Sequence, residues 1–300
     1  MQVTVLYGGP SAEREVSLVS GKAVAAGLRE AGHKVNEIDV RPESLDAALK
    51  NVADVVFPVL HGTWGEDGQL QAILEQRKLR FVGSGAAASR LGMDKAATKV
   101  AWEKAGLPTP PYELVTNAKP TTAIKAPCAV KAVDSGSSVD VYICKTQPDA
   151  DKALKTLLGK YGRALVEQFI KGPELTVGLL EEKALAPIRI VPKVEFFDFE
   201  AKYKRNDTEH RFDTGLPADL IEKCQRLAEQ GNAVVGARDL ARIDIMIDEK
   251  TQQPYMLEIN TLPGFTPKSL LPEAAGHSGI TFSQLVDRLV KRAQSRGNRH

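Results

Sequence analysis

Apolar and polar residues alternate along the first 85 positions in two ways, one typical of β-strands and the other of helices. The strand-like runs are QVTVLYG, KVNEIDV, DVVFPVL and RFVGSG, and helix-like spacing covers about 16–31 and 67–76. Strands that alternate with helices form parallel sheets, which bind ligands at the carboxyl ends of the strands. We therefore expect a parallel-sheet domain over residues 1–85, with functional turns at GGPSAEREVS and HGTWGEDG.

The pattern changes after residue 85. A helical stretch, LGMDKAATKVAWEKAG, leads through the proline-rich link LPTPPYEL into the strands CAVKAV and VDVYICK, which the turn DSGSS joins as a hairpin. The runs ALVEQFI, ELTVGLLE and ALAPIRIV then predict an antiparallel meander. These patterns indicate mixed α+β structure, which we divide into residues 86–166 and 167–300.

One long segment, residues 195–215, has no clear period. Its sequence, EFFDFEAKYKRNDTEHRFDTG, is polar and flanked by aromatic residues. Ordered loops of this length are usually lids or binding loops, so we predict a lid here. The chain continues with the helix LIEKCQRLAEQGNAVV, the hairpin ARIDIMIDEKTQQPYMLEIN, the loop TLPGFTPKSLLP and a final helix with one apolar stripe.

Composition changes this picture little. The 300 residues are 43% apolar and 26% charged, enough for two or three domains. The net charge of +2 gives no argument for a nucleic-acid or membrane partner. No run approaches the ~18 apolar residues of a membrane span, and the first residues lack a signal-peptide pattern, so we expect a cytoplasmic protein. The three cysteines have no CxxC spacing and are expected as reduced core residues.

The last hairpin carries an unusual polar face. In ARIDIMID the isoleucines face one side of the strand, so Arg242 and Asp244 face the other. With a turn centred near Thr251, Asp244 lies opposite Glu258, and Arg242 lies opposite Asn260. Opposed carboxylates destabilise a sheet, so we expect a cation between them. Carboxylate and amide oxygens suit a hard ion such as Mg²⁺, and a solvated hairpin face is the alternative.

Two other segments are candidates for nucleotide binding. Lys131 ends a strand just before the DSGSS turn, where backbone N–H groups and an ammonium group can hold phosphate oxygens. The strand ALVEQFI offers backbone groups to a nucleobase edge, and Glu174 in the following KGPE turn offers a carboxylate to a ribose. An edge strand followed by a surface turn is the alternative interpretation of this second segment.

Eight motifs together resemble one known family. They are GGPSAEREVSLVSG (8–21), HGTWGEDGQLQ (61–71), GSGAAASRLGMDK (83–95), VKAVDSGSSV (130–139), EQFIKGPELTVG (167–178), FDFEAKY (197–203), ARIDIMID (241–248) and LEINTLPGFTPKSLLP (257–272). Their order is that of the D-alanine–D-alanine ligase family of the ATP-grasp superfamily. The resemblance implies an α/β and α+β fold of the ATP-grasp type. A Rossmann-like N-terminal domain (1–85) would precede two mixed α+β domains (86–166, and 167–300 with the lid) that enclose the nucleotide.

The resemblance also implies a two-step reaction. The carboxylate of one D-alanine takes the γ-phosphoryl group of ATP to form an acylphosphate. The amino group of a second D-alanine then displaces phosphate, giving the dipeptide used in peptidoglycan precursor synthesis. Family members use Mg²⁺, here expected as two ions with Mn²⁺ as a substitute, and form homodimers. ATP and D-alanine are thus the expected partners, and most of the protein's work is positioning and charge stabilisation.

Matched position by position, the family's nucleotide site falls on three groups of residues. The Mg²⁺ ligands would be Asp244, Glu258 and Asn260. Contacts to the ATP phosphates would come from Lys95, Lys131 and, on the lid, Lys202. The adenine and the ribose would be held by Glu167, the backbone of Phe169 and Ile170, and Glu174.

The family's amino-acid site matches a second set of residues. The first D-alanine would be bound through its ammonium group by Glu13, which the family links through Ser137 to Tyr203, and His61 would lie near the same substrate. The tetrahedral oxyanion would be stabilised by Arg242 and the backbone N–H of Gly264. The carboxylate of the second D-alanine would be held by Ser269 and Leu270. Each residue has an ordinary structural explanation by itself, and their joint occurrence is what indicates a site.

The sequence departs from the family pattern beside the phosphate loop. Ala132 stands where a proline is usual, and Asp140 replaces a glycine. An added acid would repel ATP and a non-glycine residue would strain the backbone, so we expect Asp140→Gly to bind ATP equally or more tightly. This departure keeps open a non-catalytic nucleotide-binding homologue, besides another ATP-grasp carboxylate–amine ligase. A Rossmann-type dehydrogenase is disfavoured, because GGPSAER lacks the GxGxxG spacing.

Overall fold

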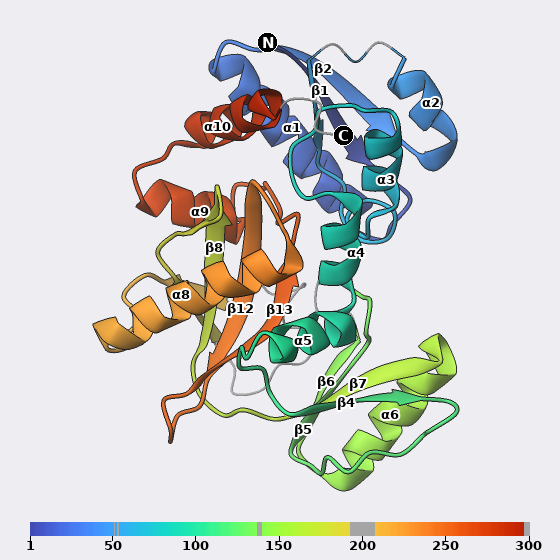
Figure 1. Cartoon of the computed structure of the whole chain (residues 1–300), viewed down its shortest axis with the longest axis vertical. Helices are drawn as coiled ribbons and strands as arrows, with labels where there is room; N and C mark the ends of the chain where they lie inside the picture. The colour runs from blue at the N-terminus through green and yellow to red at the C-terminus, as the bar shows by residue number, and fades with distance from the viewer. Residues whose placement is uncertain (51, 53, 137–139, 193–207, 297–300) are drawn as a thin grey trace.

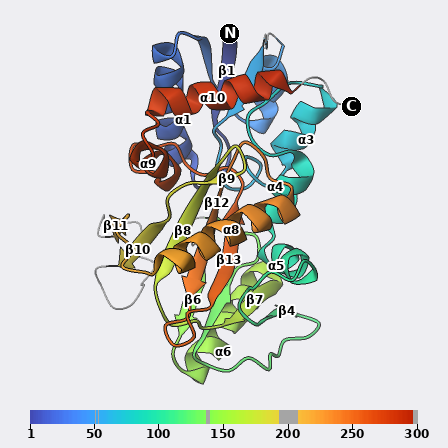
Figure 2. The same cartoon turned by 60° about the vertical axis from the view of Figure 1, so that its left-hand side comes forward.

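The computed structural model describes residues 1–50, 52, 54–136, 140–192 and 208–296. Three β-sheets follow one another down the long axis of the molecule: a parallel sheet, a larger antiparallel sheet and a smaller antiparallel sheet (Figure 1). Figure 2 shows the same three tiers from another side, with β10 and β11 at one edge of the middle tier. We call them the first, middle and small sheets.

The first sheet has the strand order β2-β1-β3 with all strands parallel, as the sequence predicts. Its strands are β1 (Gln2–Gly8), β2 (Lys34–Val40) and β3 (Val55–Pro58), and the short helices η1 (Pro42–Ser44) and α2 (Leu45–Ala48) follow β2. Because side chains alternate along β1, Val3 and Val5 pack with α1 (Arg14–Glu30), while Leu6 packs with α3 (Gln69–Gln76) on the opposite face.

The middle sheet has the antiparallel order β11-β10-β8-β12-β13, and β9 also pairs with β8. Its strands are β8 (Glu174–Leu180), β9 (Lys183–Ala184), β10 (Ile188–Pro192), β11 (Thr208–Arg211), β12 (Leu240–Ile247) and β13 (Pro254–Asn260). Helix α8 (Ala218–Val235) covers one face, where Cys224 and Leu227 pack with Ile243 and Ile245. The opposite face of β12 and β13 carries the polar residues.

The small sheet has the antiparallel order β4-β7-β5-β6, and α6 (Gln147–Tyr161) covers one face. Its strands are β4 (Tyr112–Thr116), β5 (Cys128–Lys131), β6 (Val141–Cys144) and β7 (Arg163–Gln168). The predicted β5–β6 hairpin is confirmed. Cys128 and Cys144 lie opposite each other in it as free, buried thiols, and burial raises the pKa of both. All three cysteines are therefore core residues, as expected.

Two helices connect the first sheet to the others. The sequence predicts one helical stretch here, but the chain breaks at Asp94 into α4 (Ala86–Met93) and α5 (Lys95–Lys104). The Asp94 side chain caps α5 by accepting a hydrogen bond from the Ala97 N–H (2.8 Å). Trp102 on α5 donates from Nε1 to the Gly231 carbonyl of α8 (3.0 Å), which fixes α5 against the middle layer.

The C-terminal helices return to the first sheet. Helix α9 (Leu270–His277) follows the loop after β13, and α10 (Phe282–Ser295) lies beside α1 (Figure 1). Leu285 and Leu289 of α10 belong to the same buried cluster as Val3 and Val5 of β1. The core of the first sheet is therefore completed by residues from the far end of the sequence.

Two strand predictions and one loop prediction need correction. ALVEQFI does not join a meander with ELTVGLLE, because β7 pairs with β4 and β5 in the small sheet, whereas β8 belongs to the middle sheet. The link between them crosses close to β12, where a Cβ on Gly172 would lie 1.9 Å from the Ile247 carbonyl oxygen. RFVGSG forms only a single bridge, between Phe81 and Val56. Within the predicted lid, residues 208–211 form strand β11.

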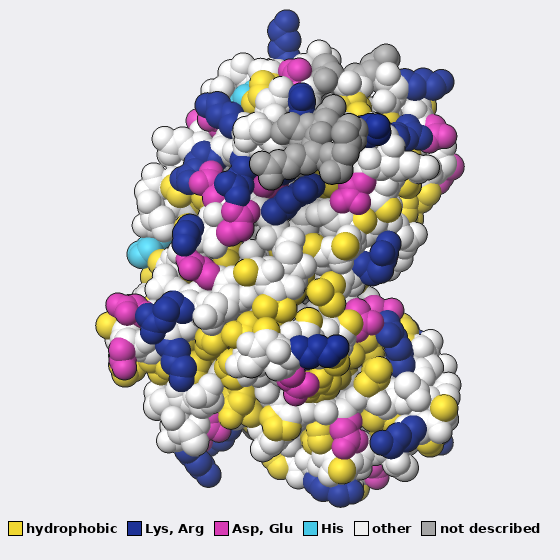
Figure 3. Space-filling model, in the orientation of Figure 1, with side chains coloured by type: hydrophobic (Ala, Val, Ile, Leu, Met, Phe, Trp, Pro, Cys, Tyr) yellow, Lys and Arg dark blue, Asp and Glu magenta, His cyan; other side chains and the backbone are white. Residues whose placement is uncertain are grey.

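Charged side chains of both signs are mixed over the surface in Figure 3, and apolar side chains gather near its middle. The exposed large apolar residues include Val100 of α5 and Leu114 of β4. Among the described residues, no helix has the length and apolar character that crossing a bilayer requires.

Candidate active site

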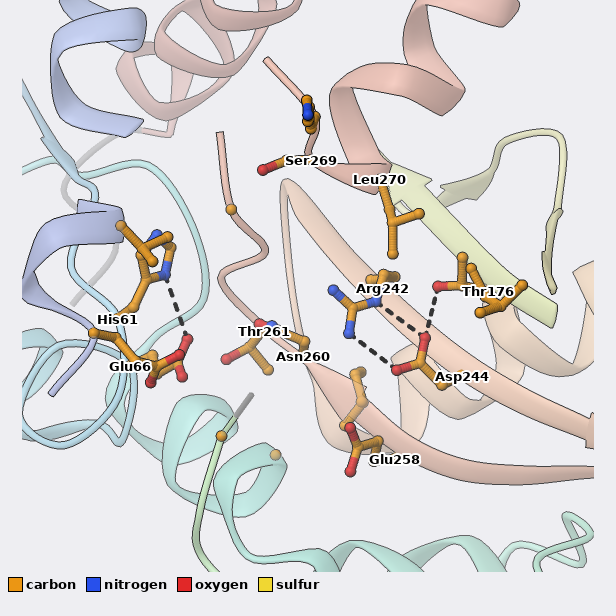
Figure 4. Close-up of a pocket in the computed structure, with 18 of the residues that line it drawn as sticks. His61, Glu66, Thr176, Arg242, Asp244, Glu258, Asn260, Thr261, Ser269 and Leu270 are labelled. Carbon is orange, nitrogen blue, oxygen red and sulfur yellow. Dashed lines mark hydrogen bonds and ion pairs between the residues drawn. The ribbon is translucent and has the colours of Figure 1, made fainter. Parts of the chain in front are cut away.

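A cavity of about 840 Å³ lies where segments of all three tiers meet (Figure 4). Its wall combines the turns after β1 and β3, the start of α5, the loop after β5, and residues of β8, β12 and β13 and of the loop after β13. The sequence-predicted site residues that line it are Glu13, His61, Lys95, Glu174, Arg242, Asp244, Glu258, Asn260, Gly264, Ser269 and Leu270.

The pairing predicted for the last hairpin is confirmed. Asp244 lies opposite Glu258, and Arg242 lies opposite Asn260. A register shift between Asp244 and Ile245 adds one residue to the β13 side. The pairs nearer the turn are therefore offset by one residue from the pairing that a turn centred near Thr251 predicts. The isoleucines of β12 are buried and the polar residues between them face the cavity, as expected.

Each of the two opposed carboxylates is paired with a basic side chain of the protein. Arg242 donates from Nε and Nη2 to the two oxygens of Asp244, at 3.0 Å each, and Thr176 Oγ1 donates to the same carboxylate (2.6 Å; Figure 4). Glu258 lies 3.6 Å from the Lys95 ammonium group, which donates to the Ser135 carbonyl (2.6 Å). The like charges on this hairpin face are therefore balanced by an arginine and a lysine.

The oxygen atoms of this face suit a hard cation that brings other ligands with it. Asp244 and Glu258 lie opposite each other beside Asn260, and all three line the cavity. Within the described ranges, no cluster of three or more His, Cys, Asp or Glu side chains forms a complete metal site. Two carboxylates and an amide are an incomplete shell for Mg²⁺, which commonly fills its remaining positions with water and substrate phosphates.

Lys131 and Glu167 do not line the cavity directly but form a buried ion pair behind it. The Lys131 ammonium lies 2.5 Å from Glu167 Oε2, and the ammonium of Lys99 lies 2.8 Å from Glu167 Oε1. Burial alone raises the pKa of a carboxyl, but the two ammonium groups outweigh it and lower the pKa of Glu167 to about 2. Glu167 is therefore ionised throughout the physiological pH range.

The predicted adenine segment follows directly after β7. Phe169 donates its backbone N–H to the Pro127 carbonyl (3.4 Å), and Ile170 is buried. Neither residue lines the cavity, whereas Glu174 at the start of β8 does. The roles of Glu167, Phe169 and Ile170 toward adenine stay predictions.

Glu13 and His61 meet at the end of the cavity that the first sheet supplies. Glu13 precedes α1, His61 follows β3, and Glu66 lies buried beside them with Oε2 3.8 Å from His61 Nδ1 (Figure 4). Burial and the Glu66 charge raise the pKa of Glu13 to about 7, although His61 opposes this shift. This end of the cavity is therefore an acidic pocket that suits an ammonium group.

The pKa of Glu13 predicts how substrate affinity depends on pH. A carboxyl with a pKa of about 7 is mostly neutral at pH 6 and mostly ionised at pH 8, so its ionised fraction rises about tenfold between them. We expect the KM for the ammonium-bearing substrate to fall by about that factor over this range. Steady-state kinetics of the wild type and of Glu13→Gln check this, because the variant should have a high KM at every pH. Glu15→Gln, an exposed acid on α1, should behave like the wild type, and a flat wild-type profile contradicts the assignment.

The loop after β13 and the start of α9 supply another part of the cavity lining. Ser269 is the N-cap residue of α9, and its Oγ accepts a hydrogen bond from the Thr266 N–H (2.9 Å). A Cβ on Gly264 would lie 2.9 Å from this Oγ, so the close approach favours glycine. Leu270 begins α9 and lines the cavity (Figure 4). The N-terminus of α9 therefore lies at the cavity, and a helix N-terminus suits a carboxylate.

Asp140 does not direct an unpaired charge at the phosphate loop. Its carboxylate accepts hydrogen bonds from Lys160 Nζ (2.6 Å), Tyr161 OH (2.5 Å) and Tyr142 OH (3.2 Å). Burial opposes ionisation, but these donors outweigh it and lower the pKa of Asp140. The backbone has φ +54°, in the left-handed region that favours glycine, so the expected backbone strain is present.

Replacing Asp140 by glycine should therefore still leave ATP affinity equal or tighter. The expected cause is now the backbone strain alone and no longer the repulsion of ATP. Glycine relieves the backbone strain, while the charge that is removed is already balanced by Lys160. Isothermal titration with ATP checks this, and Asp140→Asn separates the charge from the backbone because it keeps the strain. A clear weakening of ATP binding in Asp140→Gly contradicts the prediction.

Three predicted residues, Ser137, Lys202 and Tyr203, lie outside the described residues, so the link from Glu13 through Ser137 to Tyr203 stays a prediction. Sequence reasoning missed Lys99 and Glu66. Glu66 occurs in the quoted motif HGTWGEDG, where its spacing from His61 was the available signal. The sequence gives no signal that Lys99 is buried, because a lysine on a helix usually faces solvent.

Comparison with solved structures defines the class. The crystal structure of D-alanine–D-alanine ligase from Bacillus anthracis superposes with a TM-score of 0.88 at 31% identity, covering 98% of this chain and 99% of that one. The same enzyme complexed with ATP gives a TM-score of 0.87 at 30% identity, covering 98% and 97%. The fold, with two antiparallel sheets and a cavity lined by lysine and carboxylate side chains, is that of an ATP-grasp enzyme.

Sequence comparison then defines the family. The family models described as D-ala D-ala ligase N-terminus and D-ala D-ala ligase C-terminus match residues 33–84 and 101–291. The D-alanine–D-alanine ligase of Geotalea uraniireducens is 42% identical over 296 residues, 97% of this chain and 95% of that protein. That of Gluconobacter oxydans is 43% identical over 304 residues, 99% and 100%. The chain belongs to the D-alanine–D-alanine ligase family and is therefore a ligase.

Proposed function

We propose that this protein joins two D-alanine molecules into D-alanyl-D-alanine, with ATP converted to ADP and phosphate. The observation that carries the proposal is one cavity whose lining combines an acidic pocket, a cation-balanced carboxylate pair and a helix N-terminus. These features match the ammonium of one amino acid, a nucleotide triphosphate and the carboxylate of a second amino acid.

In the first step the carboxylate oxygen of one D-alanine attacks the γ-phosphorus of ATP, and the bond to the ADP oxygen breaks. Glu13 would hold the substrate ammonium, with His61 beside it. Lys95 and Lys131 would balance the phosphate charge. This step is needed because a free carboxylate resists attack by an amine.

Mg²⁺ would be held by Asp244, Glu258 and Asn260, whose oxygen donors fit such an ion. When bound, it would neutralise phosphate charge and orient the oxygens for in-line transfer. Arg242 already holds Asp244 in place through two hydrogen bonds, so the carboxylate is oriented before a nucleotide arrives.

In the second step the amino nitrogen of the other D-alanine attacks the acylphosphate carbon, and phosphate leaves as the amide forms and the nitrogen loses a proton. Ser269 and Leu270 at the start of α9 would hold the carboxylate of this D-alanine. Arg242 and the Gly264 N–H would stabilise the tetrahedral oxyanion, since donors fixed before the reaction stabilise developing charge without reorganisation.

The decisive experiment measures ADP release from Mg²⁺-ATP with and without D-alanine, and product mass. We expect strict dependence on D-alanine and one dipeptide per ADP. A panel of D- and L-amino acids separates this activity from that of another ATP-grasp carboxylate–amine ligase. ATP binding without D-alanine-dependent ADP release would favour a non-catalytic homologue.

The dipeptide would serve peptidoglycan precursor synthesis in the cytoplasm, and the protein would act as a homodimer. The division into residues 1–85, 86–166 and 167–300 stays a prediction, with α10 packed on the first part and β7 of the second part continuing to Gln168. Size-exclusion chromatography with light scattering tests the dimer.

A further inference from the structure

Lys99 is a fully buried lysine that the proposed roles leave unused. Its side chain, on α5, is 0% exposed. The ammonium group contacts Glu167 Oε1 at 2.8 Å and donates to Thr109 Oγ1 at 2.5 Å. Burial of an ammonium group is costly unless it is paired, so a lysine at this depth requires an explanation.

The charged groups around Glu167 are unequal in number, because two ammonium groups pair with one carboxylate. One carboxylate, 1% exposed, lies between two ammonium groups, with Lys99 at Oε1 and Lys131 at Oε2. The three side chains therefore carry one positive charge in excess. Burial lowers the pKa of Lys99, while the acids around Lys131 outweigh burial and raise its pKa. Those acids include Glu258, which lines the cavity, so the Lys131 ammonium group interacts with charge on the cavity wall.

Lys99 also lies at the junction between the small and middle sheets. Thr109 Oγ1, which accepts from Lys99, donates to the Met256 carbonyl of β13 (2.9 Å). Glu167 is in β7 of the small sheet. One side chain therefore connects the two sheets on either side of the proposed nucleotide site and fixes the carboxylate that pairs with Lys131.

We propose that Lys99 is a positioning residue for ATP. By occupying one oxygen of Glu167, it leaves the charge of Lys131 only partly cancelled, so that the phosphates of the nucleotide supply the missing negative charge. The inference rests on the proposed function through the role of Lys131 as a phosphate contact. Without Lys99, one carboxylate would cancel one ammonium, and the nucleotide would meet a neutral pair.

The test changes the net charge of the group formed by Lys99, Glu167 and Lys131 and measures the affinity for ATP. In Lys99→Met the excess charge is zero, and we expect the dissociation constant of ATP to rise about tenfold, with KM for ATP rising and kcat changing less. Adenosine, which has no phosphates, should bind Lys99→Met as it binds the wild type, and Lys99→Arg should remain close to wild type. A loss of adenosine affinity as large as the loss of ATP affinity overturns the proposal, because a change in packing or in the position of Glu167 would weaken both ligands equally.

Titration calorimetry with ATP and with adenosine, without D-alanine, gives the affinities, and thermal unfolding shows that each variant is folded. Lys99→Gln, which keeps a hydrogen-bond donor but no charge, carries the same expectation as Lys99→Met should the methionine variant not fold. Lys104→Met, an exposed lysine on the same helix, is the matched control and should bind like the wild type. Unchanged ATP affinity in the charge-removing variants refutes the role of Lys99. Failure of ligase activity in the wild type refutes the proposed function instead.

Discussion

Replacing Arg242 by lysine should lower kcat about a hundredfold, which is the effect of removing one fixed oxyanion donor in other enzymes. The Arg242 guanidinium donates to both oxygens of Asp244 from Nε and Nη2, which leaves Nη1 toward the cavity. A lysine ammonium lacks this planar geometry and cannot hold Asp244 at two points while stabilising an oxyanion. D-alanine-dependent phosphate release measures the loss.

The matched control is Arg226→Lys, on the exposed side of α8, where the arginine pairs with Glu222 at 3.4 Å. It should retain wild-type turnover. The KM for ATP in Arg242→Lys should rise by a smaller factor than kcat falls, because the oxyanion contact forms mainly in the transition state, whereas the weaker hold on Asp244 affects the bound nucleotide. A variant with near-normal kcat would remove Arg242 from the oxyanion site.

Glu258→Gln should lower turnover at least about tenfold. The change keeps the shape of the side chain but removes its negative charge, so Asp244 and Asn260 would bind a divalent cation with one charged ligand fewer. The Mg²⁺ concentration at half-maximal activity should therefore rise together with the fall in kcat. Activity measured over a Mg²⁺ series at saturating ATP checks both effects.

Glu222→Gln, an exposed acid on α8, serves as the control and should leave both quantities unchanged. Glu258 also lies 3.6 Å from Lys95, so a loss of this ion pair alone has to be separated from a loss of metal binding. Excess Mg²⁺ should restore part of the activity only if the carboxylate binds the ion. Near-wild-type turnover at every Mg²⁺ concentration would refute the ligand role.

The hairpin shows how far sequence reasoning reaches. Strand alternation and opposed charges were enough to predict that Asp244 meets Glu258 and that Arg242 meets Asn260. The bulge after Asp244 is not visible in the sequence, because alternation and charge assign residues to the two faces of a strand but do not reveal an extra residue in one of them. Eleven of the residues predicted from the motifs line one cavity, since the motifs fall on the turns after β1 and β3, the polar face of β12 and β13, and the starts of α5 and α9.

Other features depend on contacts between distant segments. The run ALVEQFI belongs to the small sheet because it pairs with β4 and β5. Local periodicity predicts a strand but not which strands pair with it. The burial of Lys99 follows from the position of Glu167 68 residues later (167 − 99). The charge of Asp140, expected to repel ATP, is balanced by Lys160 on a helix that the sequence does not associate with it.

The packing of α10 on α1 has a consequence for synthesis of the chain. Apolar residues of β1 and α1 share one core with Leu285, Val286 and Leu289. This core is therefore completed only after the last helix has been synthesised. At the ~5–20 residues per second of a ribosome, the interval between synthesis of β1 and of α10 lasts roughly fifteen to sixty seconds. During this interval the nascent N-terminal segment exposes an unfilled apolar surface, and a truncated product lacking the last helix would be a natural client for chaperones and proteases.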